Sequence, residues 1–235
     1  MLTVKSVTKV AAGDGFSVFC SDNGLIMTCG KKEYCGIKNL SEDLTKPKLV
    51  EKLLSVDILT VACGSKHTVA VAEGGKVYAW GDGGYGRLGT GSEENECGAD
   101  GTVLISDSGT LFAMGSNKYN KIGLNKRRGF FSHTRERPRA GFIIETLDGL
   151  TEIEKALTPT PLRRSCCRVV DASLGAKHMA ILLESGHVHT FGDNSKGQLG
   201  KGHTQNMHGC VAVNAMDDKT VVIYTRNVES QFLIV

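Results

Sequence analysis

A glycine-rich motif and several histidines are the residues whose types and spacing could support chemistry. Gly81-x-Gly83-x-x-Gly86 matches the fingerprint that binds dinucleotide phosphates. That fingerprint needs a strand before it and a helix after it, and the segment 87–91, Arg-Leu-Gly-Thr-Gly, is too rich in glycine to begin a stable helix. We therefore interpret these glycines as turn residues and expect no bound cofactor.

His187 and His189 could support metal binding. They alternate along an expected strand and would face the same way, with His203 or His208 close behind them in the sequence. No pattern of Asp, Glu or Cys accompanies them, and zinc sites are usually completed by such residues. We therefore expect no metal site.

His67 and His178 each stand three residues after a glycine at corresponding places in the chain. A repeated histidine at the start of a hairpin favours a structural hydrogen bond over catalysis. The sequence also lacks the V-A-I-K, H-R-D and D-F-G motifs of kinases, a nucleophile elbow and a zinc-protease helix. We expect that this chain is not an enzyme.

The segment from Lys126 to Arg168 is an insertion whose first part is strongly basic. Between Lys126 and Arg139, six basic residues against Glu136 give a charge of +5, whereas the whole chain is +3. The segment is either a solubilising loop or a docking patch for an acidic protein or for nucleic-acid phosphates. Because the basic charge is local, we favour a protein partner, and nucleic acid is not expected. The candidate residues are Lys126, Arg127, Arg128, Phe130, Phe131, Arg135, Arg137 and Arg139.

Thr158-Pro159-Thr160-Pro161 contains two Thr-Pro steps and is followed by two arginines. As structure it predicts an extended turn, because a residue before proline avoids the helical region. As regulation, Thr158 and Thr160 are candidate sites for proline-directed kinases, since a phosphate there could pair with the arginines.

Internal repeats must position all of these residues. Four segments align without gaps, and each carries glycine at three corresponding positions, which form three columns. Such columns indicate duplication. They are Gly13, Gly24, Gly30; Gly64, Gly75, Gly81; Gly98, Gly109, Gly115; and Gly175, Gly186, Gly192.

Each repeat predicts an antiparallel hairpin. The apolar runs 69–72 and 180–183 are typical of strands buried on both faces. Turn residues with glycine follow them, and then the alternating strands 76–80 and 187–191, the first of which ends at Trp80. We predict an all-β protein in which these hairpins repeat.

The sequence of the repeats resembles that of the regulator of chromosome condensation (RCC1-type) family. The shared marks are the Cys63-Gly64-x-x-His67-Thr68 opening, the strand 77–81, Val-Tyr-Ala-Trp-Gly, and the Gly-Gln-Leu-Gly loop at 197–200. The resemblance implies blades of a seven-bladed β-propeller. It covers about residues 4–202.

Within this superfamily the segments 13–19, 97–102 and 117–125 resemble the propeller of NIMA-related mitotic kinases, where it regulates the catalytic domain. The implied function is a non-catalytic, protein-binding regulatory scaffold in cell-cycle or ciliary signalling. The kinase domain would lie in the same chain or in a partner. The alternatives are a guanine-nucleotide exchange factor for a Ran-like GTPase and a propeller piece of a ubiquitin ligase.

The spacing of the repeats departs from the family. Between first-column glycines, the interval from Gly64 to Gly98 is too short to leave outer strands after Gly89, and the next interval is lengthened by the insertion. We predict one propeller region over 1–235 with about four blades, in an open or partial ring. Its units are 4–54, 55–91, 92–168 (insertion 126–168), 169–220 and a partial unit 221–235. The open edges predict self-association or a covering partner.

Composition and cysteine usage indicate the cellular compartment in which the protein is expected. No apolar run approaches the length of a membrane-spanning helix, and the first residues do not form a signal peptide, so no membrane segment is expected. The eight cysteines include no C-x-x-C motif and favour free thiols in a reducing compartment. We expect a cytoplasmic location, with nuclear, centrosomal and ciliary locations as alternatives.

Overall fold

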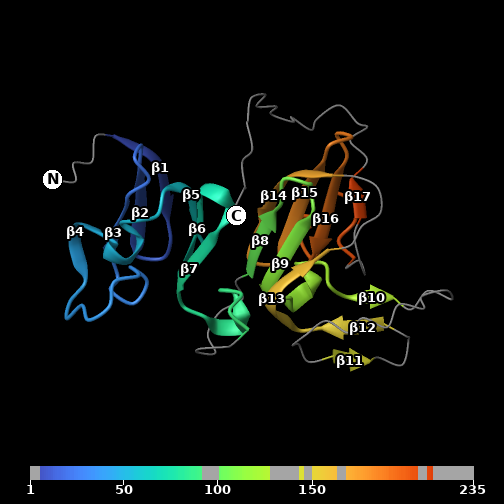
Figure 1. Cartoon of the computed structure of the whole chain (residues 1–235). Coiled ribbons are helices and arrows are strands. Elements are labelled where there is room, and N and C mark those ends of the chain that lie inside the picture. Colours follow the sequence, from blue (N-terminus) through green and yellow to red (C-terminus); the bar gives the residue numbers. More distant parts are fainter. Residues whose placement is uncertain are drawn as a thin grey trace.

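Four antiparallel β-sheets follow one another along the chain, one for each repeat (Figure 1). The computed structural model describes residues 6–91, 101–127, 143–145, 150–162, 168–205 and 211–213. Together the sheets form an open arc of propeller blades, as the repeats predicted.

The strands keep the same order in each sheet. The first sheet contains β1 (Val7–Ala12), β2 (Phe16–Ser21), β3 (Ile26–Gly30) and β4 (Leu44–Leu49). The second contains β5 (Ile58–Cys63), β6 (His67–Ala72) and β7 (Val77–Gly81). The third has the order β13 (Lys155–Pro161), β9 (Leu111–Ser116), β8 (Gly101–Ile105). The fourth contains β14 (Val169–Leu174), β15 (His178–Leu183), β16 (Val188–Gly192) and β17 (Val211–Val213).

In the described part of the chain, single-turn 3-10 helices lie between strands: η1 (Glu51–Leu53), η2 (Glu73–Gly75), η3 (Gly84–Gly86) and η4 (Lys118–Asn120). Among the helices of the described residues, none has the length and apolar character needed to cross a membrane.

The second and third sheets, which flank the short spacing between repeats, have fewer described strands than the first and fourth. Within the described residues, the second sheet has no strand beyond β7, and the third has none inside β8. In the first and fourth sheets these places belong to the outermost strands β4 and β17 and the innermost strands β1 and β14. Instead, the chain after β7 packs on the third sheet, where Gly91 N donates to Leu157 O at 3.0 Å.

The insertion is not simply a loop. It contains a small sheet in the order β10 (Lys126–Arg127), β12 (Leu150–Ile153), β11 (Ile143–Glu145). Its end returns as β13, which pairs with β9 and is the outermost strand of the third sheet. The backbone of β10 and β12 lies beyond the end of this sheet in Figure 1.

The apolar runs expected to be buried on both faces behave differently in the two repeats. All six residues of β6 are buried, as predicted. In β15 the pattern alternates, and only Met179 and Ile181 are fully buried, so the prediction for 180–183 was wrong. The physical reason is position, because β6 lies between two sheets whereas no described sheet follows the fourth.

The two later glycine columns adopt backbone conformations that other residues rarely reach. The φ angle is +73° at Gly24, +76° at Gly75 and at Gly109, and +82° at Gly186. In the third column φ lies between +97° and +112° at Gly30, Gly81, Gly115 and Gly192. A Cβ at Gly81 would lie 2.5 Å from Lys66 O, so this position is closed to side chains.

Among the described residues, three apolar clusters hold the sheets together. One, of thirteen buried residues, joins the third and fourth sheets, and a second, of ten, joins the first and second. Between the second and third sheets the cluster contains only three buried residues, Val69, Leu104 and Met114. The apolar packing is therefore smallest at this junction, where the described sheets lack an outer and an inner strand.

Candidate protein-binding surface

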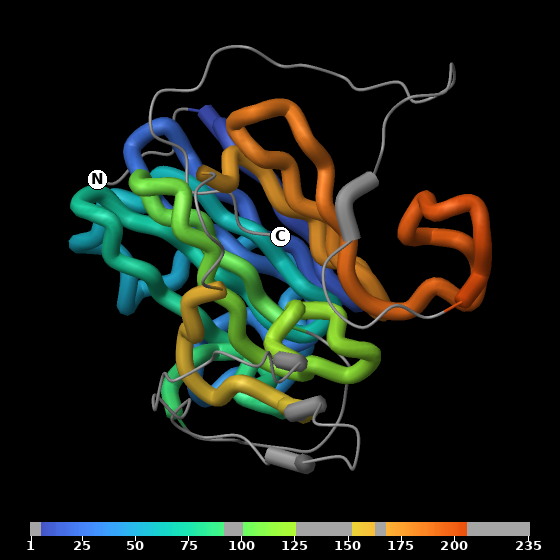
Figure 2. The backbone as a smooth tube through the Cα atoms, turned by 90° about the vertical axis from the view of Figure 1, so that its right-hand side faces the viewer, coloured from blue at the N-terminus to red at the C-terminus, as the bar shows by residue number. Residues whose placement is uncertain are grey.

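The loops at one end of the sheets form the candidate surface, which we call the loop end. It comprises the turns between the first two strands of the repeats and the loops that follow the third strands. Backbone hydrogen bonds join the two sets: Asp82 N donates to Lys66 O and Asp193 N to Lys177 O, both at 2.9 Å. Because the repeats share these bonds, the same end of each blade presents its loops together. The loop after β16 projects beyond the sheets (Figure 2).

Tyrosines occupy corresponding places in these loops. Tyr34, Tyr85 and Tyr119 each lie four residues after the third-column glycine of their repeat. Tyr85 and Tyr119 have φ angles of 56° and 65°, which bulky residues rarely adopt. Strained residues of this kind cluster at functional sites.

Lysines surround two of these rings. Lys118 Nζ lies 5.4 Å and Lys177 Nζ 5.5 Å from the centroid of the Tyr119 ring. Lys155 Nζ lies 5.8 Å from the centroid of Tyr85. Tyr119, Lys118 and Lys177 are exposed. Exposed cation–π clusters offer positive charge and a flat apolar surface to an acidic partner.

Two acidic groups at the loop end are already engaged by the chain. Asp82 Oδ2 lies 3.7 Å from Nη1 of the buried Arg87. Asp193 accepts hydrogen bonds from Ser195 Oγ at 2.8 Å, Ser195 N at 3.1 Å and Gln198 Nε2 at 3.0 Å. These bonds, chiefly that from the Ser195 hydroxyl, lower the pKa of Asp193, and the charge of Lys177 lowers it by a smaller amount. Each carboxylate is therefore held by its own loop.

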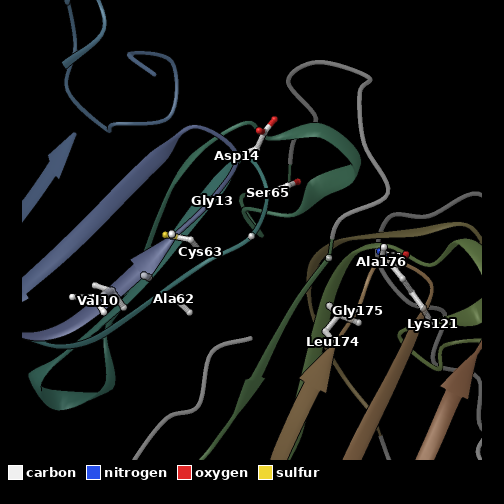
Figure 3. Close-up of a pocket in the computed structure, with 15 residues that line it drawn as sticks. Val10, Gly13, Asp14, Ala62, Cys63, Ser65, Lys121, Leu174, Gly175 and Ala176 are labelled. Carbon is white, nitrogen blue, oxygen red and sulfur yellow. Dashed lines mark hydrogen bonds between the residues drawn. The ribbon is translucent and has the colours of Figure 1, made fainter. Parts of the chain in front are cut away.

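A cavity of about 730 Å³ opens among the innermost strands at this end. Its walls come from the first, second and fourth sheets, with Gly101 and Lys121 from the third. Asp14 and Ser65 lie on one side, and Lys121 and Ala176 lie on the other (Figure 3). The fully buried Lys121 donates from Nζ to Ala176 O at 3.4 Å. The cavity reaches Gly101 at the start of β8, the innermost described strand of the third sheet.

The opposite ends of the sheets are acidic. Each repeat places a carboxylate two residues before its second glycine, in the turn between the second and third strands: Asp22, Glu73, Asp107 and Glu184. Arg168 lies beside two of them: its Nη1 is 3.9 Å from Glu184 Oε1, and its Nη2 donates to the backbone carbonyl of Asp107 at 2.5 Å. The molecule therefore carries unlike charge at its two ends.

A buried polar chain links the second and third sheets beneath the loop end. His67 Nε2 lies 2.8 Å from Thr102 Oγ1, and Thr102 Oγ1 donates to Arg87 O at 2.9 Å. Arg87 Nε in turn donates to Gly84 O at 2.8 Å. These bonds satisfy polar groups that would be costly to bury alone. His67 is therefore part of the packing between blades.

The structure places few of the predicted docking residues. The backbone of Lys126 and Arg127 forms β10, which follows the loop after β9 directly, so the insertion leaves from the loop end. The remaining basic and aromatic candidates, Arg128, Phe130, Phe131, Arg135, Arg137 and Arg139, lie outside the described residues.

Thr158 and Thr160 lie within β13 rather than in a free turn, and both are partly buried. Thr160 Oγ1 donates to Thr158 O at 3.0 Å, and Thr160 pairs with Ala113. The register shifts between Ala156 and Thr160, a stretch that contains Pro159, whereas Pro161 pairs with Phe112 on this outermost strand, where proline is tolerated.

The histidines are not brought together as a metal site. His187 precedes β16, and its Nδ1 lies 3.0 Å from Ser185 Oγ, so it is one residue outside the strand on which it was expected. Among the described residues no group of three His, Cys, Asp or Glu side chains could hold a metal ion. His208 lies outside them.

Cysteines in the described residues are free thiols: Cys20, Cys29, Cys35 and Cys63. Burial raises the pKa of Cys20, Cys35 and Cys63 above that of an ordinary thiol. These groups stay protonated and act as small apolar side chains. Cys97, Cys166, Cys167 and Cys210 lie outside the described residues, as does Gly98.

Our sequence analysis missed the tyrosines and lysines of the loop end and the burial of Lys121. The recurrence of tyrosine at one position in three repeats was the available signal. The cation–π clusters join residues from different loops, such as Tyr119 and Lys177, and no local pattern indicates such pairs.

Comparison with known families identifies the type of repeat that forms these blades. Residues 58–87 and 169–198 match one family model, and residues 23–71 and 74–105 match another. Both are described as the Regulator of chromosome condensation (RCC1) repeat. Residues 23–105 and 169–198 are thus RCC1 repeats. The resemblance predicted from the Gly-x-x-His openings and the 77–81 strand is thereby confirmed.

Relatives of these RCC1 repeats include NIMA-related kinases. The serine/threonine-protein kinase Nek8 of Danio rerio is 31% identical over 219 residues, which is 87% of this chain and 30% of Nek8. Nek9 of Xenopus laevis is 31% identical over 207 residues, covering 84% of this chain and 22% of Nek9. The E3 ubiquitin-protein ligase HERC2 of Mus musculus is 31% identical over 233 residues, covering 92% of this chain and 4% of HERC2. The chain thus spans less than a third of each relative.

Solved structures share the fold. Prp20p from Saccharomyces cerevisiae superposes with a TM-score of 0.69 at 15% identity, over 92% of this chain and 52% of Prp20p. Human WBSCR16 gives a TM-score of 0.65 at 19% identity, over 88% of this chain and 53% of that chain. The chain is an RCC1-repeat propeller region and not a kinase domain.

Proposed function

We propose that this chain is a non-catalytic, protein-binding propeller that regulates a NIMA-related kinase through its loop end. The exposed cluster of Tyr119 between Lys118 and Lys177 supports this proposal most directly. Similarity to Nek8 and Nek9 over most of the chain supports the choice of kinase. The process would be cell-cycle or ciliary signalling, in the cytoplasm or at a nuclear, centrosomal or ciliary site.

The positive charge of the loop end indicates which kind of partner surface would bind there. Lysines on tyrosine rings favour an acidic segment, since the flat ring can pack against its apolar stems while the ammonium groups pair with carboxylates. The basic insertion begins at the same end through β10, so Arg128 to Arg139 would enlarge this surface. The kinase domain would bind it from the same chain or from another.

Charge reversal at the loop end tests the proposal. The chain should bind the catalytic domain of a NIMA-related kinase and change its rate of substrate phosphorylation. In the double variant Lys118→Glu, Lys177→Glu the dissociation constant should rise about tenfold or more, because two attractive contacts become repulsive. Calorimetry and a phosphate-transfer assay measure the two effects.

The matched control reverses two exposed lysines at the opposite end. Lys52→Glu, Lys76→Glu changes the net charge of the chain by the same amount and lies at η1 and beside η2. This control should bind as the unsubstituted chain does. Equal losses in both double variants would show that only net charge matters, and an unsubstituted chain that does not bind would reject the kinase as the partner.

Nucleotide exchange on a Ran-like GTPase remains the alternative function. The likeness to Prp20p, whose structure was described with its binding properties to Gsp1p and histones, raises this candidate. Exchange should accelerate the release of labelled nucleotide from the GTPase, whereas a kinase regulator should leave that release unchanged. The same purified chain serves both assays.

A further inference from the structure

The strands β3, β7, β9 and β16 correspond to one another, since each contains the third-column glycine of its repeat. In the first, third and fourth sheets an outer strand pairs with this strand: β4, β13 and β17. Among the described residues no strand pairs with β7 on the side away from β6, and we call that side the open edge. After β7 the chain crosses to the third sheet, where η3 contacts β13 and Gly91 N donates to Leu157 O (Figure 1).

Hydrogen bonds at the two ends of β7 show which backbone groups face the open edge. Ala72 N donates to Lys76 O, and Asp82 N donates to Lys66 O. Hydrogen-bonded pairs alternate along an antiparallel ladder, so the even-numbered residues from 76 to 82 face β6. The odd-numbered residues therefore direct their N–H and C=O groups toward the open edge. They are Val77, Ala79 and Gly81.

The counterparts of Val77 in the first and third sheets are bonded on this side. Ile26 O accepts from Val50 N at 2.9 Å, and Leu111 O accepts from Leu162 N at 2.8 Å. Val50 and Leu162 directly follow β4 and β13, and both are branched aliphatic residues. Ile26 and Leu111 are each 2% exposed, whereas Val77 is 41% exposed. Val77 therefore lacks, within the described residues, the cover that an outer strand gives its counterparts.

The same aliphatic pairs contribute to the packing between blades. Ile26 and Val50 belong to the cluster that joins the first and second sheets. Leu111 belongs to the cluster that joins the third and fourth sheets, and Leu162 packs against it. The three-residue cluster between the second and third sheets does not include Val77. An aliphatic residue beside Val77 would therefore enlarge the smallest of the three clusters.

The sequence of β7 lacks the residues that protect exposed strand edges. In β4, Lys48 pairs with Thr28 and faces β3, so the nitrogen of the adjacent Pro47 faces outward. In β13 the nitrogen of Pro161 faces outward in the same way, because Leu162 N bonds to β9. Proline at such positions discourages the addition of another strand. β7 contains neither proline nor a charged residue, so its open edge is a template for a further strand.

We propose that an extended segment of a partner protein adds to the second sheet as its outer strand, antiparallel to β7. Main-chain hydrogen bonds supply affinity in this mode of recognition, and alternate side chains supply specificity. The outer strands of this chain indicate the sequence that fits, through the two residues that lie across from Tyr78 and Val77 in the other sheets. These are Leu49-Val50, Pro161-Leu162 and Ala212-Val213. The partner segment should therefore carry an uncharged residue followed by valine or leucine. This contact is separate from the loop end.

A peptide of residues 45–51, Thr-Lys-Pro-Lys-Leu-Val-Glu, serves as the probe, because it reproduces most of the outer strand of the first sheet and the residues that follow it. Trp80 lies on β7, so its fluorescence should change as the peptide binds the 235-residue chain. Amide exchange measured by NMR locates the contact. The amides of Ala79 and Gly81 should exchange about tenfold or more slowly in the complex, whereas those of Tyr78 and Trp80, which face β6, should change little.

Substitutions on both partners test the aliphatic contact. Val77→Glu should raise the dissociation constant about tenfold or more, because a charge would be buried against the peptide. Leu59→Glu lies on the innermost strand of the same sheet and replaces a side chain that is 53% exposed, so it should leave the dissociation constant unchanged. A peptide carrying Val50→Asp should bind about tenfold or more weakly. Circular dichroism should match across the three proteins, since both side chains are exposed before substitution.

Four results overturn the proposal. The first is a peptide that does not bind. The second is protection of the Ala79 and Gly81 amides in the free chain to the level of Trp80, which would mean that a segment of this chain or a second copy already fills the open edge. The third is equal weakening by Leu59→Glu and Val77→Glu. The fourth is equal binding of the two peptides.

Discussion

Glycine at Gly81 is required by space as well as by backbone conformation. Its φ is +107°, and an added Cβ would lie 2.5 Å from Lys66 O. Gly74 has φ +72° with nothing within 4 Å of an added Cβ. Gly74→Ala should therefore cost only the left-handed strain of about 1 kcal/mol. Gly81→Ala should cost roughly 3 kcal/mol or more, because backbone must also move.

Urea unfolding of the two glycine variants measures this difference in the free energy of unfolding. Equal losses of stability would contradict the close contact between Gly81 and the turn at Lys66. The comparison separates conformational strain from steric exclusion at two positions of the same repeat.

The Asp193 carboxylate should make the loop after β16 sensitive to acid. Its pKa lies below the ordinary value because Ser195 and Gln198 donate to the ionised form. A lowered folded-state pKa stabilises the fold above the unfolded pKa of about 3.9, and this contribution is lost as pH falls through the folded value. Asp193→Asn should therefore be less stable than the unsubstituted chain at pH 7, and the difference should shrink in acid.

Urea unfolding at a series of pH values follows this difference. Ser195→Ala serves as the matched variant, because it keeps the carboxylate and removes its strongest donor. Ser195→Ala should reduce the acid-dependent part of the free energy of unfolding without abolishing it. A stability difference that stays constant from pH 7 to pH 2 would refute the assignment.

At the scale of elements, the pairing of β13 with β9 controls access to Thr158 and Thr160. Kinases bind substrates as extended, unpaired chains, and both threonines lie in a paired strand and are partly buried. We expect a proline-directed kinase to modify the folded chain on the order of tenfold or more slowly than a peptide of residues 153–166, because β13 must first open. Mass spectrometry of a time course measures both rates. Equal rates would show that the strand gives no protection.

The repeat hairpins could be predicted from the sequence because glycine columns and alternating apolar residues are local signals. The outcome of the short interval between Gly64 and Gly98 could also be foreseen in part, since too few residues remained after Gly89 for an outer strand. The small sheet of β10, β11 and β12 could not, because its short strands carry no clear alternation.

The candidate surface was less accessible to prediction than the fold. Tyr119 meets Lys177, which lies far away in the sequence, only because the third and fourth blades are neighbours. Lys121 reads as an ordinary surface lysine within its loop, and its burial depends on the innermost strands of other sheets. Contacts between blades follow from the arc and not from any single repeat.

For the whole molecule, the weakly packed junction between the second and third sheets predicts unfolding in two halves. Trp80, the single tryptophan, packs in the cluster that joins the first two sheets. Its fluorescence should therefore follow only that half, whereas circular dichroism follows both. We expect the two urea transitions to differ, which is a recognised departure from two-state behaviour.

Core substitutions assign the two transitions. Ile181→Ala, in the cluster of the third and fourth sheets, should lower the circular dichroism midpoint and leave the Trp80 midpoint unchanged. Val61→Ala should lower the Trp80 midpoint, and the circular dichroism transition, which reports both halves, should shift with it. Coincident transitions in all three proteins would mean that the three-residue cluster at Val69, Leu104 and Met114 couples the halves fully.

The unlike charge of the two ends has a consequence for how partners arrive. Asp22, Glu73, Asp107 and Glu184 stand at one end and the lysines around Tyr119 at the other, so the chain carries a dipole along its strands. An approaching acidic protein is turned toward the loop end before any atoms touch, which raises the rate of productive encounter. Added salt should lower the association rate far more than it raises the dissociation rate. The charges at the two ends of the blades thus orient an acidic partner protein before it makes contact.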